Sequence, residues 1–213
     1  MSKSKSVTTA QAEQVRKMAN EKGLGRKLFQ DNLLDNGTMS RVLDAVKGGL
    51  LITFGIPLIP PPGGRIHILK VKTQLDQEWR TAINAAGPDT PDSYNVRKVG
   101  NLYSPTGMGV AEEELILLNY PAGDGSWDKA IAWAKQFSLR KTDPRRVFAV
   151  GEGYPKFNYD IGPNPCYVVA TEECMFDDLR QACSVWWDDS EREAFLFWVS
   201  YYGDALGWFA FRR

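Results

Sequence analysis

The chain has 213 residues, of which 43% are hydrophobic and 24% are charged. This balance is typical of a globular protein and excludes disorder along the whole length. Lys plus Arg equals Asp plus Glu at 26 each, so net charge does not argue for nucleic acid or an anionic membrane as a partner. Proline interrupts the longest apolar stretch, Gly48 to Pro62, which stays below the roughly 18 residues of a membrane span. Since the first residues also lack the apolar segment of a signal peptide, we expect a soluble, cytoplasmic protein.

Residues 1–50 predict a polar tail followed by a helical element. Residues 1–7 alternate Ser and Lys and are expected to be disordered. Residues 8–50 are expected to form short helices; the clearest has an apolar stripe at i, i+3, i+4 and i+7, formed by Met39, Val42, Leu43 and Val46.

The charge of this N-terminal part leaves two functions open. Residues 1–50 carry nine basic and five acidic groups, whereas residues 151–213 carry five basic and eleven acidic ones. Short helices with a positive charge invite comparison with a helix-turn-helix DNA reader. We favour a helical cap or a protein-docking segment, and keep nucleic-acid binding as the alternative, with candidate contacts at Arg26, Lys27, Arg41 and Lys47.

A linker and a second domain follow. Prolines and glycines crowd the end of residues 51–64, which we interpret as a linker. We expect one α+β domain over residues 65–213. Its first elements are a half-buried strand at 65–72, a helix at 74–86 and a strand at 112–119. The only histidine, His67, is expected on the polar face of the first strand. The acidic start of the strand at 112–119 is interpreted as a solvated rim.

Capping signals define the next two helices. Ser126 is expected to cap a helix with the apolar stripe Trp127, Ala130, Ile131 and Ala134. Asp143 before Pro144 predicts the start of another short helix, because proline at the first helical position loses no hydrogen bond.

The last part of the chain predicts an antiparallel meander that ends at the C-terminus. The runs 167–171, 182–187, 194–200 and 208–212 are rich in β-branched and aromatic residues and are separated by turn formers. From Phe176 to Arg213, eleven of 38 residues are aromatic. Side chains alternate faces in a strand, so Trp186 and Trp187 must point in opposite directions, as must Phe197 and Trp198. If Phe195, Phe197 and Val199 face inward, then Leu196, Trp198 and Ser200 face outward.

Residues 126–213 resemble bacterial C-type-lectin-like domains, which include formylglycine-enzyme-like folds. The matching segments are the helix start SWDKAIAW (126–133), LRKTDP (139–144) and the aromatic last strand WFAFR (208–212). The calcium-ligating and disulfide patterns of true lectins are absent. The resemblance implies a display scaffold rather than a catalyst. The whole chain also resembles bacterial and phage-borne proteins, a resemblance that implies no activity.

Catalytic and metal-binding patterns are missing from the sequence. The cysteines Cys166, Cys174 and Cys183 are spaced by seven and eight residues and lie far from His67, so zinc is not expected and free structural thiols are. There is no phosphate loop and no nucleophile elbow. Four carboxylates could converge for glycoside hydrolysis, but we interpret them as turn residues: Asp188, Asp189, Glu191 and Asp204.

These observations favour a non-enzymatic binding protein without cofactor or metal. Flat aromatic side chains give a large contact area at a small cost in conformational entropy, so exposed ones suit a protein partner or a small ligand. Burial under another layer of the protein is the alternative for the same residues. The candidate binding residues are Trp187, Trp198, Tyr201, Tyr202 and Trp208.

Overall fold

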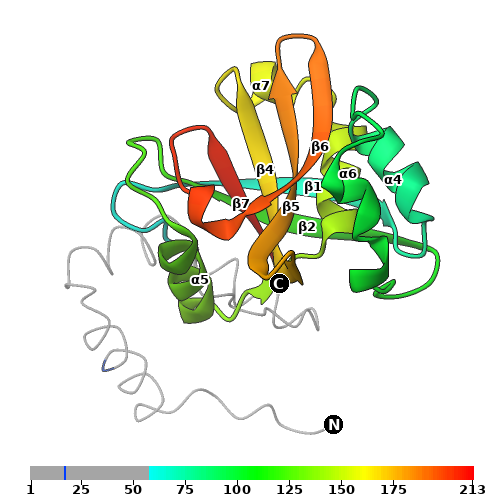
Figure 1. Ribbon diagram of the computed structural model, residues 1–213. Coiled ribbons are helices and arrows are strands. Elements are labelled where there is room, and N and C mark those ends of the chain that lie inside the picture. Colours follow the sequence, from blue (N-terminus) through cyan, green and yellow to red (C-terminus); the bar gives the residue numbers. More distant parts are fainter. Residues whose placement is uncertain (1–16, 18–57) are drawn as a thin grey trace, which may run out of the picture. The chain divides into compact units, whose positions relative to one another are not determined.

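The structure, a computed structural model, describes residue 17 and residues 58–213. Apart from Lys17, the expected tail and N-terminal helices lie outside the described residues. So do the first part of the expected linker and all four candidate nucleic-acid contacts: Arg26, Lys27, Arg41 and Lys47. Residues Leu58–Arg213 form one unit, and its helices and sheet confirm the α+β class (Figure 1).

The elements of this unit alternate between long strands and short helices. In chain order they are β1 (Arg65–Gln74), α4 (Trp79–Ala86), the 3-10 turns η2 (Asn95–Lys98) and η3 (Gly100–Leu102), β2 (Val110–Asn119), α5 (Trp127–Gln136), β3 (Arg140–Lys141), α6 (Pro144–Gly153), α7 (Phe157–Asp160), β4 (Cys166–Phe176), β5 (Leu179–Asp188), β6 (Glu191–Trp198), η4 (Val199–Tyr201) and β7 (Gly207–Arg212).

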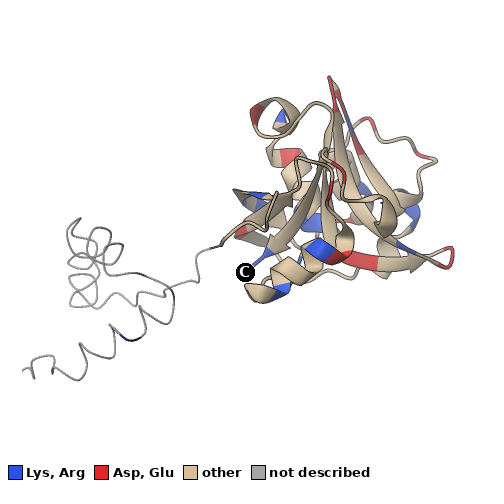
Figure 2. Ribbon diagram, turned by 90° about the vertical axis from the view of Figure 1, so that its left-hand side faces the viewer, with Lys and Arg blue, Asp and Glu red and all other residues tan. Residues whose placement is uncertain are grey.

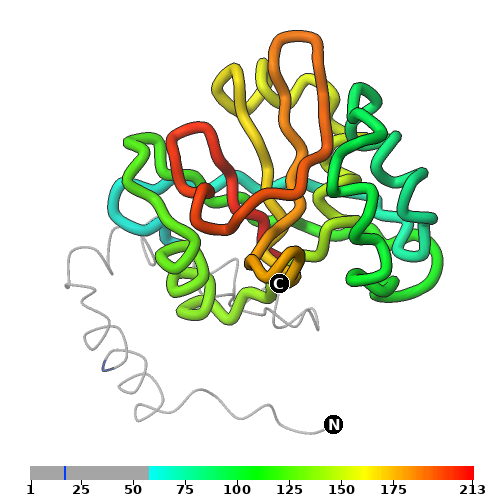
Figure 3. Tube along the Cα trace, viewed as in Figure 1, coloured from blue at the N-terminus to red at the C-terminus, as the bar shows by residue number. Residues whose placement is uncertain are grey.

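Seven strands of the described part form one mixed sheet in the order β1-β2-β7-β4-β5-β6, with the short β3 beside β7. All pairs are antiparallel except β4 and β7, which run parallel. The expected meander is therefore correct for β4, β5 and β6 and wrong for the last strand. After β6 the chain crosses back, and β7 inserts between β2 and β4 (Figure 3).

The placement of β7 has a physical reason in its sequence. Gly207 to Phe211 are all buried. A strand at the edge of a meander would leave apolar side chains and one row of backbone groups in water, whereas a central strand covered on both faces buries them.

Each face of the sheet has its own hydrophobic core. Helices α4, α6 and α7 cover one face through Ile83, Phe148 and Phe157. Helix α5 covers part of the other face, where its Trp127 and Trp133 contact Phe209 and Phe211 of β7.

Side-chain caps fix where the helices begin. The Oγ of Ser126 accepts a hydrogen bond from the Lys129 amide, and the Asp143 carboxylate accepts one from the Arg146 amide, so both expected caps are confirmed. Helix α4 begins later than expected. Glu78 caps it by accepting from the amides of Arg80 and Thr81, and Gln74 belongs to β1.

A buried ion pair changes the interpretation of the acidic start of β2. Arg146 is almost fully buried and donates to Glu113 Oε1 over 2.9 Å and to Thr106 Oγ1 over 2.8 Å, and it also pairs with Asp143. Glu112 is exposed and pairs with Lys72 at the surface. The expected solvated rim is therefore wrong for Glu113, because a guanidinium buried under β2 needs a carboxylate partner.

Candidate binding site

A cavity of about 330 Å³ lies on the sheet face that α5 shares, over β5 and β6. Its lining comes from β4, β5, β6 and the connection between β6 and β7: Tyr167, Ser184, Trp186, Phe195, Phe197, Tyr201, Tyr202 and Asp204. Six of these eight residues are aromatic. The volume is at the small end of the roughly 300 to 1,000 Å³ that ligand sites span.

The register between β5 and β6 creates the hollow. Ser184 lies opposite Phe195, and Ala182 lies opposite Phe197. Side chains directly across an antiparallel pair share a face. Two small side chains of β5 therefore lie between large ones from the neighbouring strands, and this difference in size leaves the space.

The floor is held in place by Tyr202. Its hydroxyl donates to the Ala182 carbonyl over 3.0 Å and forms a second hydrogen bond with the Ser184 hydroxyl over 3.2 Å. Burial raises the pKa of Tyr202, so this hydroxyl stays protonated at neutral pH and acts as a donor. The side chain supports the cavity from within rather than standing at the surface.

The walls are rings in mutual contact. Tyr167 and Trp186 stack with centroids 5.9 Å apart and planes 13° apart. At the opposite wall, Phe197 and Tyr201 meet edge to face at 5.0 Å. Such ring pairs stabilise each other beyond their burial, by about 0.5 to 1.5 kcal/mol, so the walls are preformed.

The polar groups of the lining are hydroxyls and a single carboxylate, that of Asp204. Tyr167 donates through its hydroxyl to Asp204 Oδ1 over 3.0 Å, and the Leu206 amide donates to the same oxygen over 3.0 Å. Burial raises the pKa of Tyr167, which remains a neutral donor. Glu193 lies opposite Trp186 in the register and so shares the cavity face. Burial, and then the nearby charges of Glu191 and Asp89, raise the pKa of Glu193.

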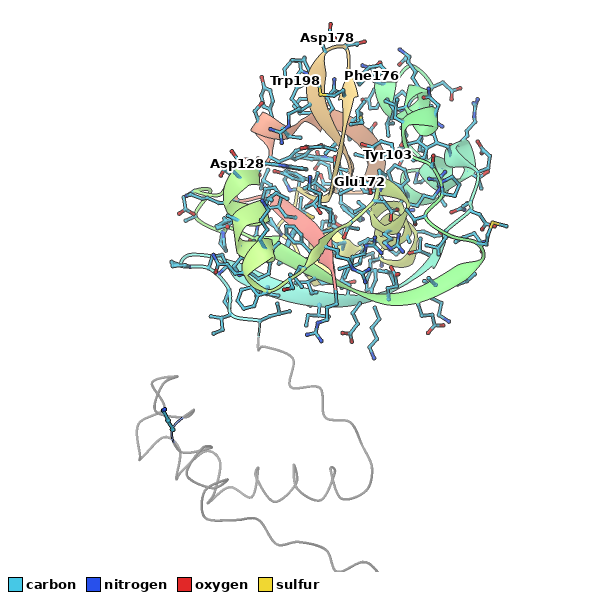
Figure 4. The ribbon with its side chains drawn as sticks, turned by 90° about the horizontal axis from the view of Figure 1, so that it is seen from below. Tyr103, Asp128, Glu172, Phe176, Asp178 and Trp198 are labelled. Atoms are coloured by element: carbon cyan, nitrogen blue, oxygen red, sulfur yellow. The ribbon has the colours of Figure 1, made fainter. Side chains whose placement is uncertain are left out.

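The structure brings some of the expected binding residues together and separates others. Tyr201 and Tyr202 line the cavity. Trp198 is exposed, and its ring centroid lies 5.2 Å from that of Tyr201. It lies next to the β4–β5 turn, where Figure 4 labels Asp178. Trp187 and Trp208 are 1% and 2% exposed and belong to the core under α6 and α7. They cannot meet a partner on this surface, which corrects the expectation for these two residues.

The arrangement weighed from the sequence is wrong for residues 195–197 and correct for residues 198–200. Leu196 points into the core, and Phe195 and Phe197 point into the cavity. As expected, Val199 is buried, whereas Trp198 and Ser200 are exposed. Trp186 and Trp187 do point in opposite directions, as the alternation predicted: Trp187 belongs to the core, and Trp186 lines the cavity.

Sequence reasoning did not assign most of the cavity lining: Tyr167, Ser184, Trp186, Phe195, Phe197 and Asp204. A signal for the strand residues exists, because alternate residues of 182–186 read Ala, Ser, Trp while alternate residues of 193–197 read Glu, Phe, Phe. This pattern becomes informative only when the strand register is known, because the register places the small side chains of 182–184 opposite the large ones of 195–197.

The metal-binding, histidine and acidic candidates weighed from the sequence lie outside the cavity, except for Asp204. Within residues 58–213, no group of three or more His, Cys, Asp or Glu side chains could hold a metal ion. His67 lies beside Trp208, with ring centroids 6.4 Å apart, and burial, followed by the charge of Arg65, lowers its pKa. Asp188 and Glu191 lie opposite each other in the register at the β5–β6 turn, next to Asp189, whereas Asp204 lies at the cavity.

The aromatic cavity is not the largest hollow of the described unit. One of about 650 Å³ lies beside residues 59–62, at the point where the described segment begins, and one of about 570 Å³ runs along the exposed lysines of β1. The aromatic cavity is the one whose walls are built from interlocking side chains of the sheet.

Comparison with known proteins gives no assignment: no protein-family model, curated protein or solved structure matches the chain. In the part of the chain that the structure describes, no helix is long and apolar enough to cross a membrane.

Proposed function

We propose that this protein is a non-enzymatic binding protein whose ligand site is the aromatic cavity of β4, β5 and β6. The observation that supports the proposal best is the cavity itself: six aromatic side chains line an open hollow of about 330 Å³. Concave, mostly apolar hollows with a small number of placed polar groups are the usual form of ligand sites.

The aromatic cavity gives no support to catalysis. Its hydroxyls are those of Ser184 and of three tyrosines, Tyr167, Tyr201 and Tyr202. Burial raises the pKa of Tyr167 and of Tyr202 and keeps both neutral. The Ser184 hydroxyl is hydrogen-bonded to that of Tyr202, and His67 lies outside the lining. A nucleophile without a base can hold a ligand but is not activated. The resemblance of residues 126–213 to lectin-like display scaffolds implies the same class of function.

A ligand screen on the full-length chain tests the proposal. A compound that binds the folded state raises the unfolding free energy by about 2.7 kcal/mol at a hundredfold excess over its Kd. Small compounds that raise the melting temperature are retested on the double variant Phe197→Ala, Tyr201→Ala. Both residues are more than 40% exposed, so the fold should tolerate the change.

Tyr159→Ala is the matched control, because Tyr159 is as exposed as Tyr201 and lies on α7, away from the cavity. The proposal predicts loss of the ligand effect in the double variant and its retention in the control. A ligand that stabilises all three proteins equally binds elsewhere, and the cavity is then not the site.

A further inference from the structure

The charges around the cavity are one-sided. Asp204 is the single charged residue of the lining. On the same sheet face, the register places the acidic side chains of Asp188, Glu191 and Glu193 at the end near the β5–β6 turn, visible at the top of Figure 2. The nearest cation of this face on β5, Arg180, is paired with Glu173 at 2.7 Å. A positive ligand group therefore meets attraction from both ends of the cavity.

The walls also favour a positive charge. The face of an aromatic ring carries the negative part of its quadrupole and attracts a cation within about 6 Å of the ring centroid. Trp186 belongs to one wall of this small space, and Phe197 and Tyr201 form the opposite wall. A cation there meets several rings at once.

The scarcity of hydrogen-bond acceptors decides which cation fits. A primary ammonium has three N–H donors and a guanidinium has five, and each donor left without an acceptor on burial costs free energy. Asp204 Oδ1 already accepts two hydrogen bonds, and the Ser184 hydroxyl is engaged with Tyr202. Asp204 Oδ2 and the Tyr201 hydroxyl remain, which are fewer side-chain acceptors than the three donors of a primary ammonium. A quaternary ammonium has no N–H donor and presents only methyl groups, so it loses nothing in an aromatic site.

We propose that the cavity binds a small organic cation through a methylated ammonium group, held by the rings of Trp186, Phe197 and Tyr201 and by the carboxylate of Asp204. The inference rests on the proposed function, since it names the ligand class of the same cavity.

Choline and its neutral carbon isostere, 3,3-dimethyl-1-butanol, test the charge directly, because the two have the same shape. Binding to the full-length protein is followed by tryptophan fluorescence and calorimetry. We expect choline to bind about tenfold more tightly than the isostere, a difference of about 1.4 kcal/mol, because only choline gains the attraction between its charge and the rings. Acetyl-trimethyllysine amide, in a parallel titration, separates a free cation from a modified side chain as the source: whichever binds more tightly is the closer match.

Two variants assign the effect to residues. Tyr201→Leu keeps an apolar wall without a ring, and Asp204→Asn keeps the acceptor oxygen without the charge. Each should weaken choline severalfold and leave the isostere unchanged, while Tyr159→Leu should change neither.

The remaining outcomes separate this inference from the proposed function. Equal affinity for choline and its isostere, or tighter binding of methylguanidinium than of choline, overturns the cation inference but leaves the cavity as a ligand site. Failure of both compounds, with another compound from the screen losing its effect in the cavity double variant, overturns the inference alone. Failure of every compound overturns both.

Discussion

At the scale of single residues, small side chains matter as much as the aromatic ones. Ser184 and Ala182 on β5 leave the space that Phe195 and Phe197 enclose, and the Tyr202 hydroxyl fixes the floor by bonding to both. A cavity of this kind depends on differences in side-chain volume across a register, because protein interiors are otherwise filled to crystal-like density.

The Arg146–Glu113 ion pair predicts how stability responds to acid. Hydrogen bonding to Arg146 lowers the pKa of Glu113 below its ordinary value. A carboxylate whose pKa is lower in the folded than in the unfolded state contributes stability above its unfolded pKa, and loses it as pH falls toward the folded pKa. Glu113→Gln should therefore cost about 1 to 2 kcal/mol at neutral pH, and should reduce the loss of stability between about pH 5 and pH 3.

Urea unfolding at several pH values measures this difference. Glu114→Gln is the matched control, since Glu114 is the exposed neighbour on the same strand. The control should respond to acid as the parent does. An identical acid response of parent and Glu113→Gln would show that the pair does not carry pH-dependent stability.

The three cysteines predict a graded reactivity. All are free, with Cys166 and Cys183 buried and Cys174 partly exposed. Burial raises the pKa of Cys166 to about 12 and raises that of Cys183 as well. Because the thiolate is the reactive form, iodoacetamide at pH 8 should modify Cys174 in the folded protein and all three only in urea. Peptide mass spectrometry identifies the sites; rapid labelling of Cys183 without denaturant would contradict the burial.

At the scale of elements, local signals were the ones that could be predicted. The caps Ser126 and Asp143 depend on neighbours three residues away, so the sequence determines them. Strand identity followed from β-branched and aromatic runs in the same way. Which face of β6 lies in the core did not follow, because both faces carry large apolar side chains and either facing buries a comparable area.

The β4–β5 turn gives a prediction at this scale. Asp177 and Asp178 connect the paired residues Phe176 and Leu179, and both have positive φ, 51° and 60°. Two-residue turns of this shape prefer glycine at the second position, because a Cβ is unfavourable there. Asp178→Gly should raise the free energy of unfolding by about 0.5 kcal/mol, measured by urea unfolding.

The β5–β6 turn supplies the control for that substitution. There Asp189 has positive φ and Ser190 does not, so Ser190→Gly adds freedom to the unfolded chain without relieving strain and should lower stability. A stabilising effect in both turns would mean that glycine acts through something other than the left-handed backbone.

At the scale of the whole molecule, β7 joins the two halves of the sheet. It pairs with β2 on one side and with β4 on the other, and thereby links β1-β2 to β4-β5-β6. The sequence contained a hint, since the run Trp208 to Phe211 does not alternate as an edge strand with one wet face would. Its partners could not be predicted, because pairing with β2 spans about ninety residues and leaves no local pattern.

This position predicts the order in which backbone amides exchange with solvent. The interior amides of β7, such as those of Phe209 and Ala210, become accessible only when the sheet separates, so they should exchange with the free energy of global unfolding. Strand β1 is an edge, and the Lys70 carbonyl on its outer side accepts from the Tyr154 hydroxyl over 2.9 Å. Since donors alternate along an antiparallel pair, the Lys72 amide points away from β2 and should exchange orders of magnitude faster. The amide of Val71 points to β2, so it is the internal control and should be protected. Native-state hydrogen exchange by NMR measures the amides of Lys72, Val71, Phe209 and Ala210. A Phe209 amide that exchanges faster than that of Val71 would place β7 outside the most stable part of the fold.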